Sequence, residues 1–219
     1  MQPNETLHLA SLGRLWHCNQ ATFLALLSAI CLFVGATFNL ALTQRMITHM
    51  LVQIPLIFIS GACAWTAWRI ASSQRTNSLF ARTQRVLHPF NAYAVPTLLV
   101  ASLVLGYWMI PKALDDVLLY RSMLVAKFIS LFIAGALFSK GWHQANVVIK
   151  LFFVGNFCWM AAIVGMLYQE QPMRVCNFYL QNDQDYTGIA LVWLAVLLPV
   201  VWALSEYKAV KQYWRTISR

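Results

Sequence analysis

Several uninterrupted apolar runs, each long enough to cross a membrane as a helix, constrain this chain more than any other feature. About 20 helical residues span a hydrocarbon core about 30 Å thick, and inside lipid each segment must satisfy its own backbone N–H and C=O groups. Only 11% of the 219 residues are charged, and 60% are hydrophobic. The sequence therefore predicts an all-α, polytopic membrane bundle that forms one domain over residues 1–219. About six membrane helices are expected near residues 21–43, 47–71, 91–110, 116–139, 147–168 and 186–205.

The net charge of +9 fits the topology of such a bundle. Connections after the first, third and fifth predicted helices carry most of the acids, whereas the tails and the other connections carry most of the Lys and Arg residues. Basic residues gather on the cytoplasmic side of membrane proteins, so both termini are predicted to be cytoplasmic. Attraction to the headgroups of membrane lipids is an expected second effect of the charge. No basic motif is interleaved with exposed aromatics, so we expect no nucleic-acid binding.

Met46, His49 and Met50 occupy positions i, i+3 and i+4 at the predicted outer end of the second helix, so they share one helix face. Thioethers favour Cu(I) and bind it without losing a proton, which makes this stripe a candidate Cu(I) site. Met173 and Cys176, in the predicted outer loop before the last helix, could complete it. A structural interpretation stays open, because Met commonly fills gaps in helical cores and a His at a helix end often bonds a neighbour.

Four of the five acids on the same predicted outer side are candidate site residues. The adjacent pair Asp115 and Asp116 could bind a cation or a basic partner, or could cap an amphipathic segment at the membrane surface. Asp183 and Asp185 are expected to shape the outer mouth of the bundle or to meet a partner. Lys127 cannot stay charged against lipid without cost, so it is expected to snorkel or to pair with an acid such as Asp116 or Asp185.

The connection before the last predicted helix, QEQPMRVCNFYLQNDQDYTG, is more apolar than a solvated loop needs to be. Phe178, Tyr179 and Leu180 predict that it packs over the outer mouth or lies among lipid headgroups. Cys176 is the single cysteine on that side, so it has no disulfide partner within the chain and is a free thiol or a ligand.

Motifs that carry catalysis are missing from the sequence. It contains no Gly-rich phosphate loop, no Ser nucleophile elbow, no HExxH and no CxxC. We therefore expect no enzyme activity.

Three stretches, taken in order, resemble the CtaG-like family of integral membrane proteins. RMITHMLVQIPLIFISG resembles a family helix in which a His-Met pair precedes an apolar run with a Pro and a closing Gly. MIPKALDDVLLYRSMLVAKFISLFIAGALF resembles the segment in which a Pro, a short amphipathic stretch and a helix follow one another. NDQDYTGIALVWLAVLLP resembles an Asp-Gln pair followed by a Gly and a helix that contains Trp. Together they cover roughly residues 43–202.

The resemblance implies a bacterial inner-membrane factor that assists copper delivery to, or assembly of, a copper-dependent respiratory or oxygen-activating enzyme such as cytochrome c oxidase. Its implied partner is a membrane subunit of that enzyme, and its implied cofactor is Cu(I). Four positions match the family pattern residue by residue: His49, Asp183, Gln184 and Gly188. The family's further outer histidines are missing here. This leaves an alternative, a non-catalytic accessory subunit of a larger membrane complex with no metal of its own.

Overall fold

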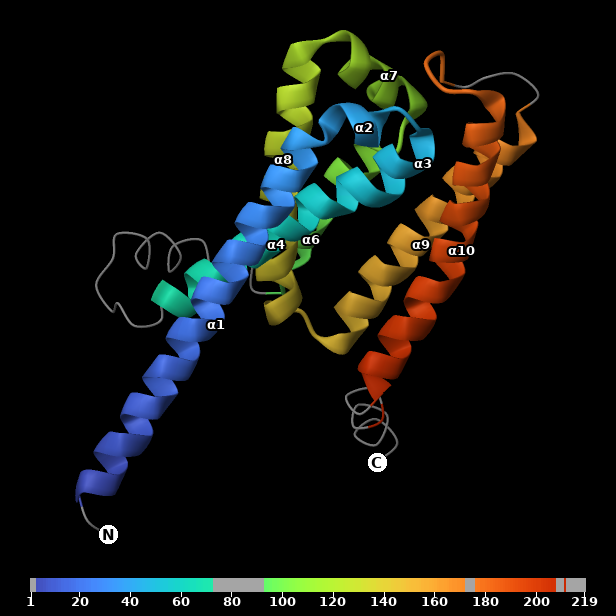
Figure 1. Ribbon diagram of the computed structural model, residues 1–219. Helices are drawn as coiled ribbons and strands as arrows, with labels where there is room; N and C mark the ends of the chain where they lie inside the picture. The colour runs from blue at the N-terminus through green and yellow to red at the C-terminus, as the bar shows by residue number, and fades with distance from the viewer. Residues whose placement is uncertain (1–2, 73–92, 172–175, 208–210, 212–219) are drawn as a thin grey trace.

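The protein is a multi-pass bundle of membrane helices (Figure 1). The computed structural model describes residues 3–72, 93–171, 176–207 and 211. Within these residues there are helices and turns and no strand. Five of the described helices are long and apolar enough to cross a membrane, and the number rises to six if one bent helix pair counts as a single span. The predicted all-α membrane fold is confirmed.

The described elements are all helices. In order they are α1 (Pro3–Thr37), α2 (Asn39–Thr43), α3 (Met46–Thr48), the π-helix η1 (His49–Gln53), α4 (Ile54–Ser72), α6 (Val95–Tyr107), α7 (Pro111–Leu119), α8 (Arg121–Gln144), α9 (Val147–Glu170) and α10 (Gln181–Ser205). We call the end of the bundle that holds α2, α3, α7 and residues 176–180 the α7 end (Figure 1). The start of α1 and the end of α10 both lie toward the opposite end, as the predicted topology requires.

Four predicted helices correspond to observed ones, with different bounds. The first is longer and ends earlier than predicted, because α1 runs from Pro3 to Thr37 and α2 is a separate short helix. The second is one continuous candidate span, Met46–Ser72, whose only irregularity is η1. The fifth matches α9 closely, and the last begins earlier than predicted, at Gln181.

The third and fourth predicted helices are wrong in their bounds. Instead of covering residues 91–110, α6 has 13 residues, a rise of about 20 Å, which is too short to cross the core alone. The chain then bends by 72° into α7, where the extended backbone of Ile110 and the ring of Pro111 end the first direction. The predicted helix 116–139 is likewise two elements, the amphipathic α7 and the membrane helix α8.

Glycines bring α4 and α8 together. A Cβ on Gly61 would clash with the backbone carbonyl oxygen of Phe132, and a Cβ on Gly135 would clash with that of Phe58. The contact is reciprocal, so each helix needs the small residue of the other. Lipid tails are as apolar as Leu, so close packing of this kind replaces the hydrophobic drive that joins helices in water.

A second glycine pair joins α9 and α10 in the same way. A Cβ on Gly165 would lie 2.7 Å from the carbonyl oxygen of Gly188, and a Cβ on Gly188 would lie 2.6 Å from that of Gly165. The α9–α10 hairpin contacts α3 and η1 near the α7 end and diverges from α4 toward the opposite end, where α9 begins shortly after α8 ends (Figure 1). One tie near the α7 end is the Tyr168 hydroxyl, which donates to the Met109 carbonyl oxygen at 2.9 Å.

Candidate functional site

The α7 end holds a buried lysine with no acidic partner among the residues that the structure describes. Lys127, on α8, is 0% exposed. Its Nζ lies 2.7 Å from Nε2 of His49 and 2.6 Å from Oε1 of Gln53, and both of these side chains are also 0% exposed. A buried ionisable group inside a membrane bundle is costly and marks a candidate functional site.

The sequence-based prediction that Lys127 snorkels or pairs with Asp116 or Asp185 is wrong. Asp116 instead pairs with Lys112 on its own helix, with 3.4 Å between Nζ and Oδ1. Asp185 accepts a hydrogen bond from Nε2 of Gln181 at 3.4 Å. A neutral imidazole and an amide thus take the place of the expected carboxylate, because α8 turns Lys127 into the bundle and away from its surface.

His49 connects the lysine to the segment before α10. Its Nδ1 lies 2.6 Å from the hydroxyl oxygen of Tyr179, which is 3% exposed. A lysine ammonium can only donate, so in that form Nε2 accepts and Nδ1 carries the imidazole proton toward Tyr179. Burial is the main cause that raises the pKa of the Tyr179 phenol, and the nearby Cys176 adds to it, so the Tyr179 side chain stays a neutral hydroxyl. We call Lys127, His49, Gln53 and Tyr179 the Lys127 network.

The π-helix η1 carries two members of this network. His49 begins η1 and Gln53 ends it, and the Ile54 N–H donates to the His49 carbonyl oxygen across the wide turn. π-Turns inside α-helices occur frequently at functional sites. The Gln53 amide also donates to Oδ1 of Asn39 at 2.8 Å and to the Gly35 carbonyl oxygen at 3.1 Å, which ties α1 and α2 to the network.

The predicted sulfur donors lie together in the same region. Met46 and Met50 are 0% and 5% exposed, and they belong to one buried apolar cluster with Cys176, which is 0% exposed. Met173 lies outside the described residues. Met46, His49 and Met50, predicted to share one helix face, are all buried.

His49 has no ring nitrogen left for a metal in this arrangement. Tyr179 takes Nδ1 and Lys127 takes Nε2. A cation at Nε2 would also meet the ammonium of Lys127 at close range, where charges of the same sign repel strongly in a dry interior. Within the described part of the chain, no three His, Cys, Asp or Glu side chains gather as a metal site. His49 is therefore not free to bind Cu(I) in this arrangement, and Cu(I) binding by the sulfur donors stays a prediction.

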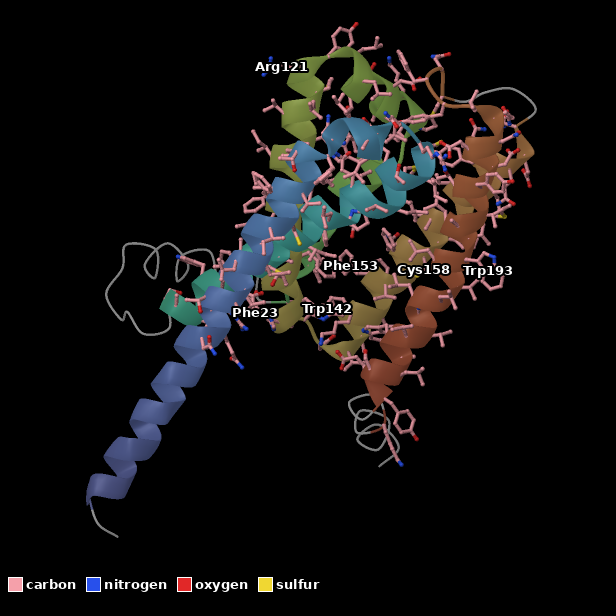
Figure 2. The ribbon with its side chains drawn as sticks, in the orientation of Figure 1. Phe23, Arg121, Trp142, Phe153, Cys158 and Trp193 are labelled. Carbon is pink, nitrogen blue, oxygen red and sulfur yellow. The ribbon has the colours of Figure 1, made fainter. Side chains whose placement is uncertain are left out.

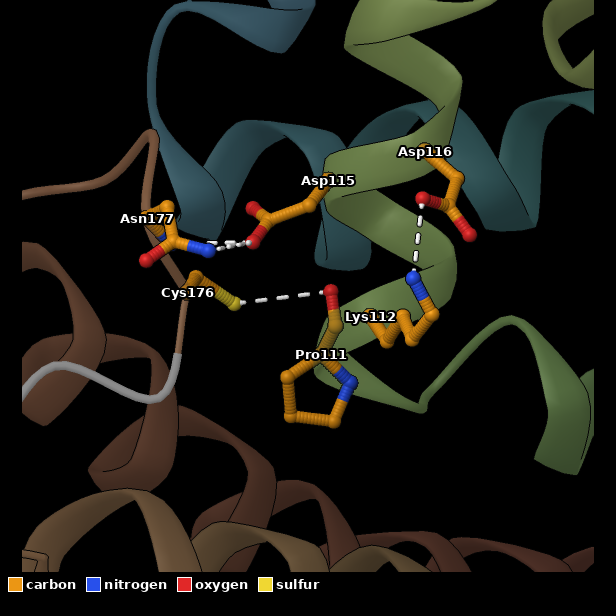
Figure 3. A network of polar contacts seen from close by, with 6 residues as sticks. All are labelled: Pro111, Lys112, Asp115, Asp116, Cys176 and Asn177. Atoms are coloured by element: carbon orange, nitrogen blue, oxygen red, sulfur yellow. Dashed lines mark hydrogen bonds and ion pairs between the residues drawn. The ribbon is translucent and has the colours of Figure 1, made fainter.

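Asp115 fixes the segment that carries Cys176 (Figure 3). Its Oδ2 accepts from the backbone N–H of Asn177 at 2.9 Å and from the Asn177 side-chain amide at 3.2 Å. The Cys176 thiol lies 3.8 Å from the Pro111 carbonyl oxygen. Burial, helped by the charge of Asp115, raises the pKa of Cys176 to about 12. This thiol is therefore protonated near neutral pH, and a metal would have to displace its proton.

Asp183 has a comparable structural contact. Its carboxylate accepts the backbone N–H of Met46 at the first residue of α3, so the start of α10 caps the start of the second membrane span. Asp115 and Asp183 thus each connect two elements of the α7 end by accepting a backbone N–H. The proposed partner contacts of Asp116 and Asp185 stay predictions.

No protein-family model, curated protein or solved structure matches the chain. The resemblance to the CtaG-like family stays a prediction that depends on the three stretches of sequence quoted above.

Proposed function

We propose that this protein is a non-enzymatic factor of a bacterial inner membrane that assists assembly of a membrane enzyme by binding a partner subunit at its α7 end. The resemblance to CtaG-like proteins suggests this role, with a copper-dependent oxidase as the partner enzyme. The observation that carries it is the Lys127 network. Its buried groups bond to one another and leave a closed, fixed end, which suits a binding surface better than a site of turnover.

The same network favours a factor with no metal of its own. Both nitrogens of His49 are bonded within the protein, and in its ammonium form Lys127 places a positive charge beside Nε2. A site selected for a cation would not hold an ammonium against its imidazole ligand. In this version the partner recognises the fixed shape of the α7 end and not a bound ion.

A second candidate, Cu(I) delivery, is favoured by the shared burial of Met46, Met50 and Cys176. Soft thioether and thiolate sulfurs select Cu(I). In this version the three sulfurs would hold the ion, and His49 would keep its bonds to Lys127 and Tyr179. The Cu(I) ion would be the cargo, and the protein would shield it from water.

One purification separates the two candidates. The protein is solubilised gently from its native membrane, copurifying subunits are identified, and copper is measured by elemental analysis. A stoichiometric membrane subunit without copper supports the metal-free factor. Copper that is lost in the Met46→Leu/Met50→Leu double variant and kept in Met166→Leu, a control on a methionine that is 46% exposed, supports the carrier. A protein that carries neither a partner subunit nor copper removes both candidates.

Charge reversal locates the partner. Asp116→Lys and Asp185→Lys change two acids of the α7 end, while Glu206→Lys changes an acid near the opposite end that pairs with Lys150 at 2.9 Å. The proposal expects loss of the copurifying subunit with the first two variants only. Equal loss with Glu206→Lys would place the contact elsewhere.

A further inference from the structure

A groove of about 580 Å³ lies where α3 and η1 meet α10, on the outside of the bundle. Its lining includes Arg45, Ile47, Leu51, Tyr186, Trp193 and Leu197. Trp193 is 61% exposed and projects outward from α10 (Figure 2). The groove therefore opens toward the membrane and does not reach into the Lys127 network.

The groove has the length of one lipid leaflet. Its polar residues lie near the start of α10, at the α7 end, and apolar residues follow along the helix. The stretch from Tyr186 to Leu197 rises about 16 Å. A hydrocarbon core is about 30 Å thick, so this wall covers about half of it. A transmembrane helix of a partner would need a groove through both leaflets, whereas a single acyl chain needs one of this length.

The polar end of the groove carries two opposite charges that do not pair with each other. Arg45 is exposed and Asp183 is half-buried. Neither forms an ion pair among the residues that the structure describes. The Asp183 carboxylate accepts the Met46 N–H through Oδ2 and lines the groove together with Arg45, and a carboxylate has acceptor capacity for further donors.

We propose that this groove binds one phospholipid of the phosphatidylethanolamine type, whose headgroup carries a phosphate and a primary ammonium. The phosphate accepts hydrogen bonds from the Arg45 guanidinium, whose planar fork of donors matches phosphate oxygens. The ammonium donates to Asp183, and one acyl chain lies along α10 past Trp193. This inference does not depend on the proposed function.

The pair of charges predicts a headgroup preference. Phosphatidylglycerol offers Arg45 a phosphate but brings no cation to Asp183. Phosphatidylcholine brings a cation, but its quaternary ammonium has no N–H to donate. Only a zwitterionic headgroup with a primary ammonium satisfies both residues, so ethanolamine lipid should bind most tightly of the three.

The test uses delipidated protein in nonionic detergent. Each of the three lipids, with identical acyl chains, is titrated in, and bound lipid is counted by native mass spectrometry. Wild type is expected to show one tight site for phosphatidylethanolamine. Arg45→Gln should weaken that site about tenfold, as expected for lost charge-assisted hydrogen bonds. Arg121→Gln, a control on an exposed arginine of the same end (Figure 2), should leave it unchanged.

Substitutions in the apolar part test the chain contact. Trp193→Ala should weaken all three lipids, whereas Trp159→Ala, on a 70% exposed tryptophan of α9, should weaken none. A photo-crosslinking residue at position 193, in native membranes, should capture lipid. Equal affinity for the three lipids in wild type, equal effects of Arg45→Gln and Arg121→Gln, or capture of a protein in place of lipid would each overturn the proposal.

Discussion

The Lys127 network and the two glycine crossings hold elements of the bundle together by opposite means. At the α7 end, Lys127, His49, Gln53 and Tyr179 are buried and satisfy one another's polar groups. At the crossings, backbones approach directly with no side chain between them. The comparison teaches which substitutions each region tolerates. Two bonded polar side chains of the Lys127 network can be replaced together with less loss of stability than one alone. A glycine at a crossing has no room for an added side-chain atom.

The largest effect is expected from Gln53→Leu. This change removes one of two acceptors of the Lys127 ammonium and the amide that donates to Asn39. A buried charge that loses a partner costs about 3–5 kcal/mol, and the free energy of unfolding in detergent measures that loss.

The double variant Gln53→Leu/Lys127→Met sharpens the same comparison. It removes the buried charge together with its acceptor, so it should recover more than half of the lost stability. Simple addition of the two single effects would contradict the view of Lys127 as an ammonium held by this network.

Gly135→Ala should come next in size. The added methyl clashes with the Phe58 carbonyl, which cannot move without α4, so we expect a loss of about 1–3 kcal/mol. Gly155→Ala on α9 is the matched control, because nothing lies within 4 Å of its Cβ position. It should be neutral or stabilise the helix by about 0.5–1 kcal/mol. Similar losses of stability in Gly135→Ala and Gly155→Ala would contradict the prediction, because the loss would then not depend on contact at the helix crossing.

Asp115→Asn is expected to act more locally, with a loss of about 1.5 kcal/mol from its bonds to Asn177. The more specific readout is maleimide labelling of Cys176, followed by mass spectrometry across pH. The pKa of this thiol is raised to about 12, so wild-type labelling should rise only toward strongly alkaline pH. Removing the charge of Asp115 lowers that pKa, so the curve should move to lower pH. Asp116→Asn should leave the curve in place, and an unchanged curve in Asp115→Asn would refute the contact.

Lys112→Ala should have the smallest effect. Its side chain is 83% exposed, and exposed pairs such as Lys112–Asp116 contribute less than about 1 kcal/mol. Lys112, which pairs with an acid, should thus matter less than Lys127, which pairs with no acid in the described part of the chain. A loss comparable to that of Gln53→Leu would reverse the comparison.

Sequence patterns predicted the coarse fold because hydropathy and length report directly on membrane helices. They also predicted an amphipathic stretch before α8, which is α7. The sequence patterns did not predict the helix bounds that tertiary contacts determine. Apolar composition alone does not show that α6 ends at Tyr107 or that α2 separates from α1.

The candidate site was only partly predictable, for a related reason. Helical spacing placed Met46, His49 and Met50 on one face, and Gln53 extends that stripe. The partners of His49 lie 78 and 130 residues away in sequence, at Lys127 and Tyr179. No local spacing encodes contacts over that distance. The usual preference of lysine for acids also pointed to the wrong partners.

The π-turn η1 fixes the rotational phase between the two halves of the second span. After η1 in the chain, α4 must present Gly61 to α8, and within η1 His49 and Gln53 must face Lys127. One residue fewer would restore a plain α-helix and rotate one half against the other by about 100°. Such a deletion could keep the helix crossing or the imidazole–lysine contact in register, but never both.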